Sequence, residues 1–171
     1  LYNRRYAQKY LRDALTDAAP PNEAVTTMIV DIDHFKRIND THGHAAGDAV
    51  LVEVARRMKD NLRTIDMVAR YGGEEFLVVL PGTELSKAGP AADRLRRMIG
   101  SVPVDIEGGK RVRVTVSIGV SVCSPDDFET EKQPVFSHRT DEQVKRLIEA
   151  ADRALYLAKE TGRNRVKVAE G

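Results

Sequence analysis

The alternation of hydrophobic and polar positions divides the chain into short periodic segments. Apolar residues at helical spacing near the start predict a first helix that ends near Asp17, before Pro20. Residues 24–33 are β-branched and almost continuously apolar, which predicts a strand covered on both faces. After a polar stretch, the apolar residues between positions 50 and 62 form one stripe of a long helix.

Two pairs of apolar runs predict β-hairpins. Residues 66–71 and 76–80 flank two glycines and two glutamates, so the glycines stand where a tight turn needs unusual backbone angles. Residues 102–106 are followed, after a Gly-Gly pair, by an alternating run over residues 112–122. This alternation predicts one half-buried antiparallel strand.

The remaining long segments predict two further helices separated by a loop. A helix is expected over about residues 84–99, although Pro90 should kink it or delay its start. Residues 124–142 are rich in acids and contain two prolines, and we interpret them as an exposed loop. Thr140 and Gln143 form a capping-box pair, so the last helix should begin there.

A final strand over residues 165–168 completes the order α, β, α, β, β, α, β, β, α, β. The chain shows no internal repeat and no interior linker, so residues 1–171 are interpreted as one domain. This order predicts an α/β sandwich, with a mixed, largely antiparallel central sheet and helices on both faces.

The charge balance, the cysteine count and the length of the apolar runs exclude several classes of function. Lys and Arg number 27 against 26 Asp and Glu, a net charge of +1, which argues against a nucleic-acid or anionic-membrane surface. The one cysteine, Cys123, excludes an internal disulfide and suits the reducing cytoplasm. No apolar run approaches the ~18–20 residues that span a bilayer. Any anionic ligand must therefore be held by local groups.

Two acidic clusters are the first candidates for chemistry. Asp31 and Asp33 end the predicted strand, and Glu74 and Glu75 occupy the predicted hairpin turn. A strand end and a hairpin can bring these carboxylates together, and Mg²⁺ binds carboxylates together with phosphate oxygens and water. This layout favours phosphoryl transfer. Solvated turn glutamates and a strand-capping aspartate are an equally supported interpretation.

Polar residues near these acids suit a guanine nucleotide. Asp48 and Asn39 could pair with the donor edge of guanine, whereas adenine would fit them poorly. Lys36, Lys159 and Arg163 could hold phosphates. Taken singly, Asn39 could instead belong to a plain turn, and the last two cations could complement a helix C-terminus.

A second pair, Arg63 and Asp66, has a spacing of three residues. The guanidinium could fork onto the O6 and N7 atoms of guanine, and the carboxylate could accept from its N1–H. On composition alone, an ordinary surface ion pair worth ~0–1 kcal/mol is favoured.

Four blocks of motif residues follow one another along the chain. They are residues 31–40 with 42–44 and 47–48, residues 70–76, residues 117–120, and residues 151–156 with 158–164. Together they resemble the GGDEF-domain diguanylate cyclases, in the Gly-Gly-Glu-Glu-Phe form, over nearly the whole chain. Two departures stand out: the Asp-x-Leu-Thr-Gly opening of the family is missing, and the acidic segment 124–140 is longer than in compact members.

The resemblance implies a nucleotidyl-cyclase or palm-like fold in which residues 1–171 are a single catalytic domain, excised from a larger bacterial signalling protein. It implies that two GTP molecules are joined into cyclic di-GMP with release of two pyrophosphates. It also implies two Mg²⁺ ions per active site, for which Mn²⁺ can substitute, a homodimer for catalysis, and an N-terminal sensory or receiver domain. No nucleic acid partner and no membrane segment in this chain are expected.

The resemblance also assigns roles by position. The implied metal ligands are Asp31, the Ile32 carbonyl, Glu74 and Glu75, and the implied catalytic residues are Glu74 as general base, Glu75 and Lys36. The implied nucleoside contacts are Asn39, His44 and Asp48, and the implied phosphate contacts are Lys36, the backbone N–H groups of His34 and Phe35, Lys159 and Arg163. Arg63, Asp66 and Arg94 match the product-inhibition site, and Asp33, Tyr71 and Phe76 are interpreted as supports.

Two other functions stay open at this point. One is a catalytically silent module that only binds cyclic di-GMP at Arg63 and Asp66. The intact acidic and phosphate positions favour the enzyme, because a receptor would not need them. The other is a relative that makes a mixed, adenine-containing cyclic dinucleotide. Asp48 argues against it, since a carboxylate would repel the acceptor N1 of adenine.

Overall fold

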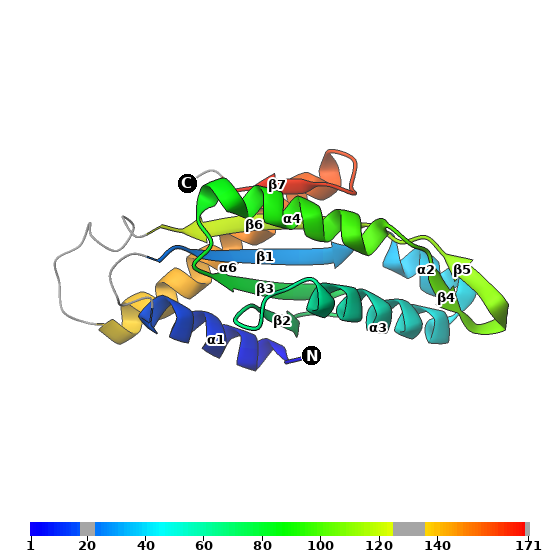
Figure 1. Ribbon diagram of the computed structural model, residues 1–171, viewed down its shortest axis with the longest axis horizontal. Helices are drawn as coiled ribbons and strands as arrows, with labels where there is room; N and C mark the ends of the chain where they lie inside the picture. Colours follow the sequence, from blue (N-terminus) through cyan, green and yellow to red (C-terminus); the bar gives the residue numbers. More distant parts are fainter. Residues whose placement is uncertain (18–22, 125–135, 170–171) are drawn as a thin grey trace.

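The computed structural model describes residues 1–17, 23–124 and 136–169. Its elements, in chain order (Figure 1), are α1 (Arg4–Asp17), β1 (Val25–Ile32), α2 (Phe35–His42), α3 (His44–Asp60), β2 (Met67–Arg70), β3 (Glu75–Pro81), α4 (Leu85–Gly100), β4 (Val104–Ile106), the 3-10 turn η1 (Glu107–Gly109), β5 (Lys110–Val112), β6 (Val116–Cys123), α6 (Phe136–Glu160) and β7 (Val166–Val168). In the described part of the chain, no helix is long and apolar enough to cross a membrane.

Five strands form the main sheet in the order β2-β3-β1-β6-β7, and β4 and β5 form a separate two-stranded sheet. Neighbours in the main sheet are antiparallel except β6 and β7, which run parallel. Helices α3 and α4 cover one face of the sheet, and α1 and α6 cover the other (Figure 1). Their apolar side chains form the two halves of the core. The predicted sandwich with a mixed, largely antiparallel sheet is therefore confirmed.

The central strand β1 is buried along its whole length. Met28 and Val30 pack in the core beneath α3 and α4, whereas Val25 and Ile29 pack beneath α1 and α6. Since both faces are covered, an uninterrupted apolar run is what this position requires. The residues at the C-terminal end of β1 are therefore held in a fixed position, with a neighbouring strand on either side.

The single strand predicted over residues 112–122 is wrong. The chain leaves the small sheet after Val112 and enters the main sheet only at Val116. Strand β6 is also not half-buried, because it lies between β1 and β7 with helices over both faces. The residues that alternate with its valines are small and pack against α6: Ser121, for example, is buried and donates a hydrogen bond to the Leu147 carbonyl at 2.8 Å.

Three helix predictions also need correction. Helix α6 begins at Phe136, so residues 136–142 are not a loop and Thr140 does not start the helix. The rest of the acidic segment lies outside the described residues apart from Ser124. The polar stretch after β1 contains an unpredicted helix, α2, and α4 begins at Leu85 without delay and contains Pro90.

Candidate active site

The two acidic clusters meet at the C-terminal end of β1. Asp31 is directly opposite Glu75 of β3 on one side and Ser117 of β6 on the other. The Ile32 N–H donates to the Glu74 carbonyl at 3.2 Å, which fixes the hairpin turn beside the strand end. The central strand and the β2–β3 hairpin therefore place the predicted acids at one edge of the fold.

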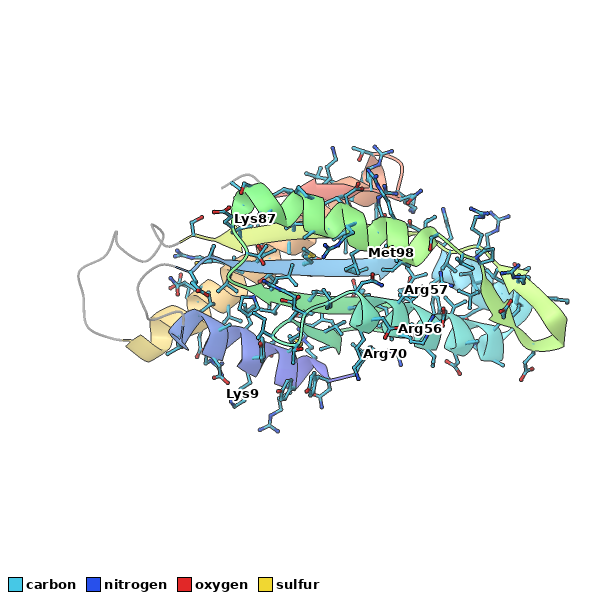
Figure 2. All side chains as sticks on the ribbon, viewed as in Figure 1. Lys9, Arg56, Arg57, Arg70, Lys87 and Met98 are labelled. Carbon is cyan, nitrogen blue, oxygen red and sulfur yellow. The ribbon has the colours of Figure 1, made fainter. Side chains whose placement is uncertain are left out.

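The hairpin turn is held by hydrogen bonds to backbone carbonyls rather than to the carboxylates of Glu74 and Glu75. The guanidinium of Arg70, at the end of β2 (Figure 2), donates to the carbonyls of Gly72 at 3.3 Å and Gly73 at 2.7 Å. The N–H groups of Tyr71 and Gly72 donate to the Glu75 carbonyl at 2.8 and 3.2 Å. A Cβ at Gly72 would lie 2.5 Å from a carboxylate oxygen of Glu75, so glycine gives this side chain room.

Burial and mutual repulsion govern the protonation of these acids. Burial raises the pKa of Asp31, and the Lys159 ammonium, 2.7 Å from its Oδ2 atom, opposes that rise in pKa. Burial, followed by the nearby Asp31 charge, raises the pKa of both Glu74 and Glu75. Among the described residues, no three His, Cys, Asp or Glu side chains already converge as metal ligands.

Helix α2 presents its N-terminus next to this edge. His34 precedes the helix with a left-handed φ of 56°, an uncommon conformation for a residue other than glycine, and its side chain does not cap the helix. The first N–H groups of a helix have no partner within it, and they carry a partial positive charge. The predicted phosphate-binding backbone at His34 and Phe35 and the Lys36 side chain therefore lie at a helix end that favours anions.

The predicted nucleoside contacts lie where α2 and α3 meet. Asn39 is in α2, so its interpretation as a plain turn is wrong, and His44 and Asp48 are exposed residues in the first turns of α3. The Oδ1 atom of Asn39 is buried without a hydrogen-bond partner among the described residues. A Cβ at Gly47 would lie 1.9 Å from this atom, so glycine permits the close approach of the two helices. Buried acceptors without a partner are uncommon in folded proteins.

The predicted phosphate contacts at the end of α6 also reach this edge. Lys159 lies against Asp31, and Arg163 is close enough to lower the pKa of Asp31 slightly against the larger effect of burial. Asp33 accepts three hydrogen bonds, from Thr115, Ser117 and the Asn164 N–H. The interpretation of Lys159 as only a helix-end cation is therefore incomplete, since it forms an ion pair with the central strand.

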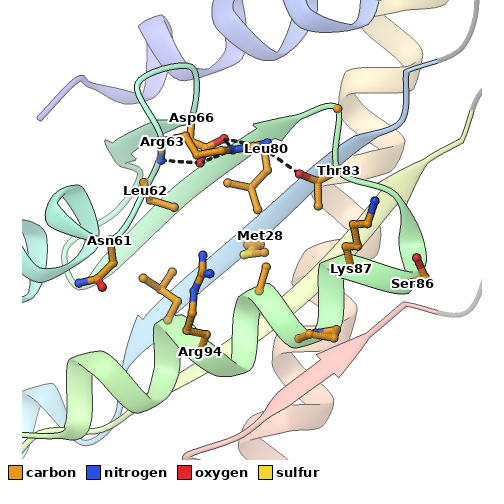
Figure 3. A pocket seen from close by; sticks show the side chains of 14 residues that line it. Met28, Asn61, Leu62, Arg63, Asp66, Leu80, Thr83, Ser86, Lys87 and Arg94 are labelled. Carbon is orange, nitrogen blue, oxygen red and sulfur yellow. Dashed lines mark hydrogen bonds and ion pairs between the residues drawn. The ribbon is translucent and has the colours of Figure 1, made fainter.

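The predicted second site surrounds a cavity of about 530 Å³ between the loop before β2 and helix α4. Arg63 donates to both carboxylate oxygens of Asp66, at 2.7 to 3.1 Å, and to the Pro81 carbonyl and the Thr83 hydroxyl. Arg94 extends from α4 into the same cavity (Figure 3). The Asp66 side chain is only 4% exposed and that of Arg63 is 52% exposed, so the pair is buried at its carboxylate and open to solvent at its guanidinium.

Comparison with known protein families identifies the family of this domain. The family model described as "Diguanylate cyclase, GGDEF domain" matches residues 1–165. The chain belongs to this family. The resemblance carried by the four motif blocks is thus confirmed for nearly the full length.

Curated relatives of this GGDEF domain are longer proteins. It is 41% identical over 156 residues to Diguanylate cyclase A of Treponema denticola. The aligned region covers 91% of this chain and 38% of that protein. It is 39% identical over 167 residues to the response regulator PleD of Caulobacter vibrioides, covering 97% of this chain and 34% of PleD. The chain spans little more than a third of these relatives.

Solved structures support the same assignment. The GGDEF domain of DgcB from Caulobacter crescentus in complex with c-di-GMP has a TM-score of 0.84 and 31% identity, covering 100% of this chain and 90% of that one. The active GGEEF domain of a diguanylate cyclase from Vibrio cholerae has a TM-score of 0.81 and 29% identity, covering 100% and 99%.

The sequence did not indicate several residues that hold this GGDEF domain's site. Arg70 and Asn164 stand inside motif blocks but carried no predicted role, and Thr115 and Arg96 stood out by no pattern. Their contacts form only when distant segments meet: Arg96 of α4 donates to the Asn164 side chain at 2.7 Å. Only Arg70, next to the hairpin glycines, and Asn164, at the end of the last motif block, carried a signal that could have found them.

Proposed function

We propose that this domain is a diguanylate cyclase that condenses two GTP molecules into cyclic di-GMP and two pyrophosphates. The observation that carries the proposal is the meeting of Asp31, Glu74, Glu75 and Lys159 at the end of β1, in a chain of the GGDEF family. A receptor that only binds the product would need the Arg63 cavity but none of these acids, so we do not favour that alternative.

The raised pKa of Glu74 suits a general base. A base works best when its pKa lies near the operating pH, and burial moves this carboxyl in that direction. In each half-reaction the 3′-hydroxyl oxygen of one GTP bonds to the α-phosphorus of the other. The α–β phosphoanhydride bond breaks, pyrophosphate leaves, and Glu74 takes the hydroxyl proton.

The acidic residues also fit divalent cations. The candidate ligands are the Asp31, Glu74 and Glu75 carboxylates and the Ile32 carbonyl, an all-oxygen set of the kind preferred by Mg²⁺ and Mn²⁺. Burial raises the pKa of all three carboxylates, and the nearby Asp31 charge raises the pKa of Glu74 and Glu75 further, so positive charge here would relieve an existing repulsion. Two bound Mg²⁺ ions, or Mn²⁺ in their place, would supply charge neutralisation at the reacting phosphate.

The cationic groups at the same edge suit the triphosphate. We assign Lys36, the N–H groups at His34 and Phe35, Lys159 and Arg163 to the β- and γ-phosphates and to the charge that develops in the transition state. Lys159 forms an ion pair with Asp31 here, so it already stands beside the carboxylates that the substrate must approach.

The product requires two such sites. Cyclic di-GMP has two-fold symmetry, and a pair of facing domains is the simplest way to present two GTP molecules to each other. We therefore propose that a homodimer is needed for catalysis and that an N-terminal sensory or receiver domain controls it. GTP as substrate and a single cysteine favour the cytoplasm as the location.

Product analysis tests the proposal directly. The protein is incubated with GTP and Mg²⁺, and the products are identified by mass spectrometry. We expect cyclic di-GMP and two pyrophosphates for each product molecule. Hydrolysis to GDP, or no conversion alongside tight cyclic di-GMP binding, would instead identify a different enzyme or a receptor.

Guanine selectivity is the second prediction. Asn39, His44 and Asp48 lie together where α2 meets α3, and the amide and carboxylate suit the guanine donor edge. ATP would leave these groups without partners, which sites of this kind penalise strongly. In a competition assay we expect GTP to be used at least about a thousandfold more efficiently than ATP. Comparable incorporation of both nucleotides would remove these residues from the guanine role.

The third prediction concerns product inhibition at the second cavity. We propose that cyclic di-GMP binds between Arg63, Asp66 and Arg94 and inhibits non-competitively. Replacement of Arg63 by alanine removes the guanidinium fork and should weaken inhibition by at least about tenfold, with turnover in the absence of product largely unchanged. Rate titrations and calorimetry with cyclic di-GMP on both proteins measure this.

Two further variants make the inhibition test specific. Arg63 also donates hydrogen bonds to the Pro81 carbonyl and the Thr83 hydroxyl, so its replacement removes contacts within the fold as well. Arg94 is not the donor in either bond, so Arg94→Ala is tested in parallel and should also weaken inhibition. Arg56→Ala is the control, because Arg56 forms exposed ion pairs within α3 and does not line the cavity. Equal inhibition constants for wild type, Arg63→Ala and Arg94→Ala would refute the site.

A further inference from the structure

The turn after α6 is held in an unusual backbone conformation. Arg163 and Asn164 both have left-handed φ angles, 59° and 45°, in two consecutive residues that are not glycine. Such conformations cost free energy and persist only where surrounding contacts impose them. Since Arg163 lies in this turn, close to the end of β1, whatever imposes the turn also sets where Arg163 stands.

One of these contacts comes from Asp33, which directly follows β1. The Asn164 N–H donates to Oδ2 of Asp33 at 3.0 Å, and Asp33 is only 5% exposed. The same carboxylate accepts hydrogen bonds from Thr115 at 2.7 Å and Ser117 at 2.6 Å. Asp33 thus ties the turn to β6 and to the strand that carries Asp31.

The other contact comes from α4. Nη1 of Arg96 donates to Oδ1 of Asn164 at 2.7 Å, across 68 positions of sequence. Arg96 is itself held by Asp93, whose carboxylate accepts from its Nε at 2.9 Å and lies 2.8 Å from its Nη2. Its side chain is 19% exposed, against 73% for the neighbouring Arg97. The Asn164 side chain is therefore gripped by a guanidinium that is already oriented.

We propose that Arg96 is a positioning residue for the phosphate-binding turn. Through Asn164, and together with Asp33, it holds the backbone that presents Arg163 to the phosphates of GTP. This inference rests on the proposed function, because it assigns GTP as the ligand of the turn. Arg96 itself does not touch the substrate.

A double-mutant cycle tests the contact. Arg96→Ala removes the donor, and Asn164→Gly removes the acceptor while keeping a residue that adopts left-handed φ readily and still offers its N–H to Asp33. Each variant should raise the KM for GTP, and the Kd for a non-hydrolysable GTP analogue, by about three- to tenfold. The kcat at saturating GTP should also fall, because Arg163 is assigned to the charge that develops in the transition state. The double variant should be no worse than either single one, because both remove the same hydrogen bond.

The control is Arg97→Ala. Arg97 is adjacent and also contacts Asp93, at 2.6 Å, but it is not bonded to Asn164, so KM and Kd should not change. Unchanged KM and Kd in Arg96→Ala and Asn164→Gly, additive effects in the double variant, or an equal change in Arg97→Ala would each overturn the positioning role. Failure of the wild type to form cyclic di-GMP would refute the proposed function, whereas binding of the analogue would still report on the turn.

Discussion

Replacement of Glu74 by glutamine is expected to reduce cyclic di-GMP synthesis by at least about a thousandfold without unfolding the domain. Glutamine keeps the size of the side chain but can neither accept the 3′-hydroxyl proton nor offer a charged ligand to a cation. Product formation from GTP and Mg²⁺, measured by mass spectrometry, checks the loss.

The same variant should be at least as stable as wild type without metal. Because the pKa of Glu74 is raised in the folded state, its stabilising contribution is complete below the pKa of the unfolded chain and is lost as pH rises through the folded pKa. Glutamine does not ionise and escapes that loss. The melting temperature of Glu74→Gln, relative to metal-free wild type, should therefore increase between acidic and neutral pH.

A matched surface carboxylate controls for general charge effects. Glu142 lies on α6 in an exposed ion pair with Arg146 at 2.8 Å, so Glu142→Gln should keep full activity. Added Mg²⁺ should raise the melting temperature of wild type and of this control more than that of Glu74→Gln. Near-normal synthesis by Glu74→Gln, or an equal Mg²⁺ effect on all three proteins, would contradict the assignment of Glu74.

Elements whose pattern reflects local burial could be predicted from the sequence. The continuous apolar run of β1 follows from a strand covered on both faces. The Gly-Gly pair correctly marks the turn before Glu74, but the expectation that it needs unusual backbone angles is wrong, because neither Gly72 nor Gly73 has a positive φ. The acidic clusters could also be placed together, since a strand end and an adjacent hairpin share one edge of a sheet.

Tertiary contacts override the pattern where the prediction failed. The alternation continues through residues 113–115, but residues 110–112 pair with β4 and residues 116–123 pair with β1, so the run is divided between two sheets. Helix α2 escaped prediction because only Phe35 and Ile38 are buried, too few for a visible stripe.

The residues of the candidate site also fall into a group that could be predicted from the sequence and a group that could not. Residues with a chemical signature, such as Glu74, Lys36 and Asp48, stand in contiguous motif blocks and could be named from the sequence. The orienting role of Arg96 and Asn164 could not be assigned, because Arg96 is an ordinary polar residue and Asn164 a motif residue without a predicted role until α4 and the turn after α6 come together. Supporting contacts of this kind depend on the completed fold.

Helix α6 carries Lys159. The close approach of this helix to the sheet depends on Gly119 of β6. A Cβ at Gly119 of β6 would lie 2.0 Å from the Ala151 carbonyl oxygen and 2.2 Å from the Leu155 nitrogen. Both are backbone atoms of a helix and cannot move aside as a side chain could. Gly119→Ala must therefore displace α6 from the sheet and separate the apolar surfaces of Ala151 and Leu155 from it.

We expect Gly119→Ala to destabilise the domain by about 3 kcal/mol or more, measured by urea unfolding. Variants that still fold should also lose turnover, because a shifted α6 moves Lys159 away from Asp31, its partner at 2.7 Å. Gly100→Ala is the matched control: its Cβ would meet only the Val114 carbonyl at 3.5 Å, an ordinary contact, so its stability should change by less than about 1 kcal/mol. If Gly119→Ala unfolds at the same urea concentration as Gly100→Ala, the close approach of α6 to β6 does not limit the position of Lys159.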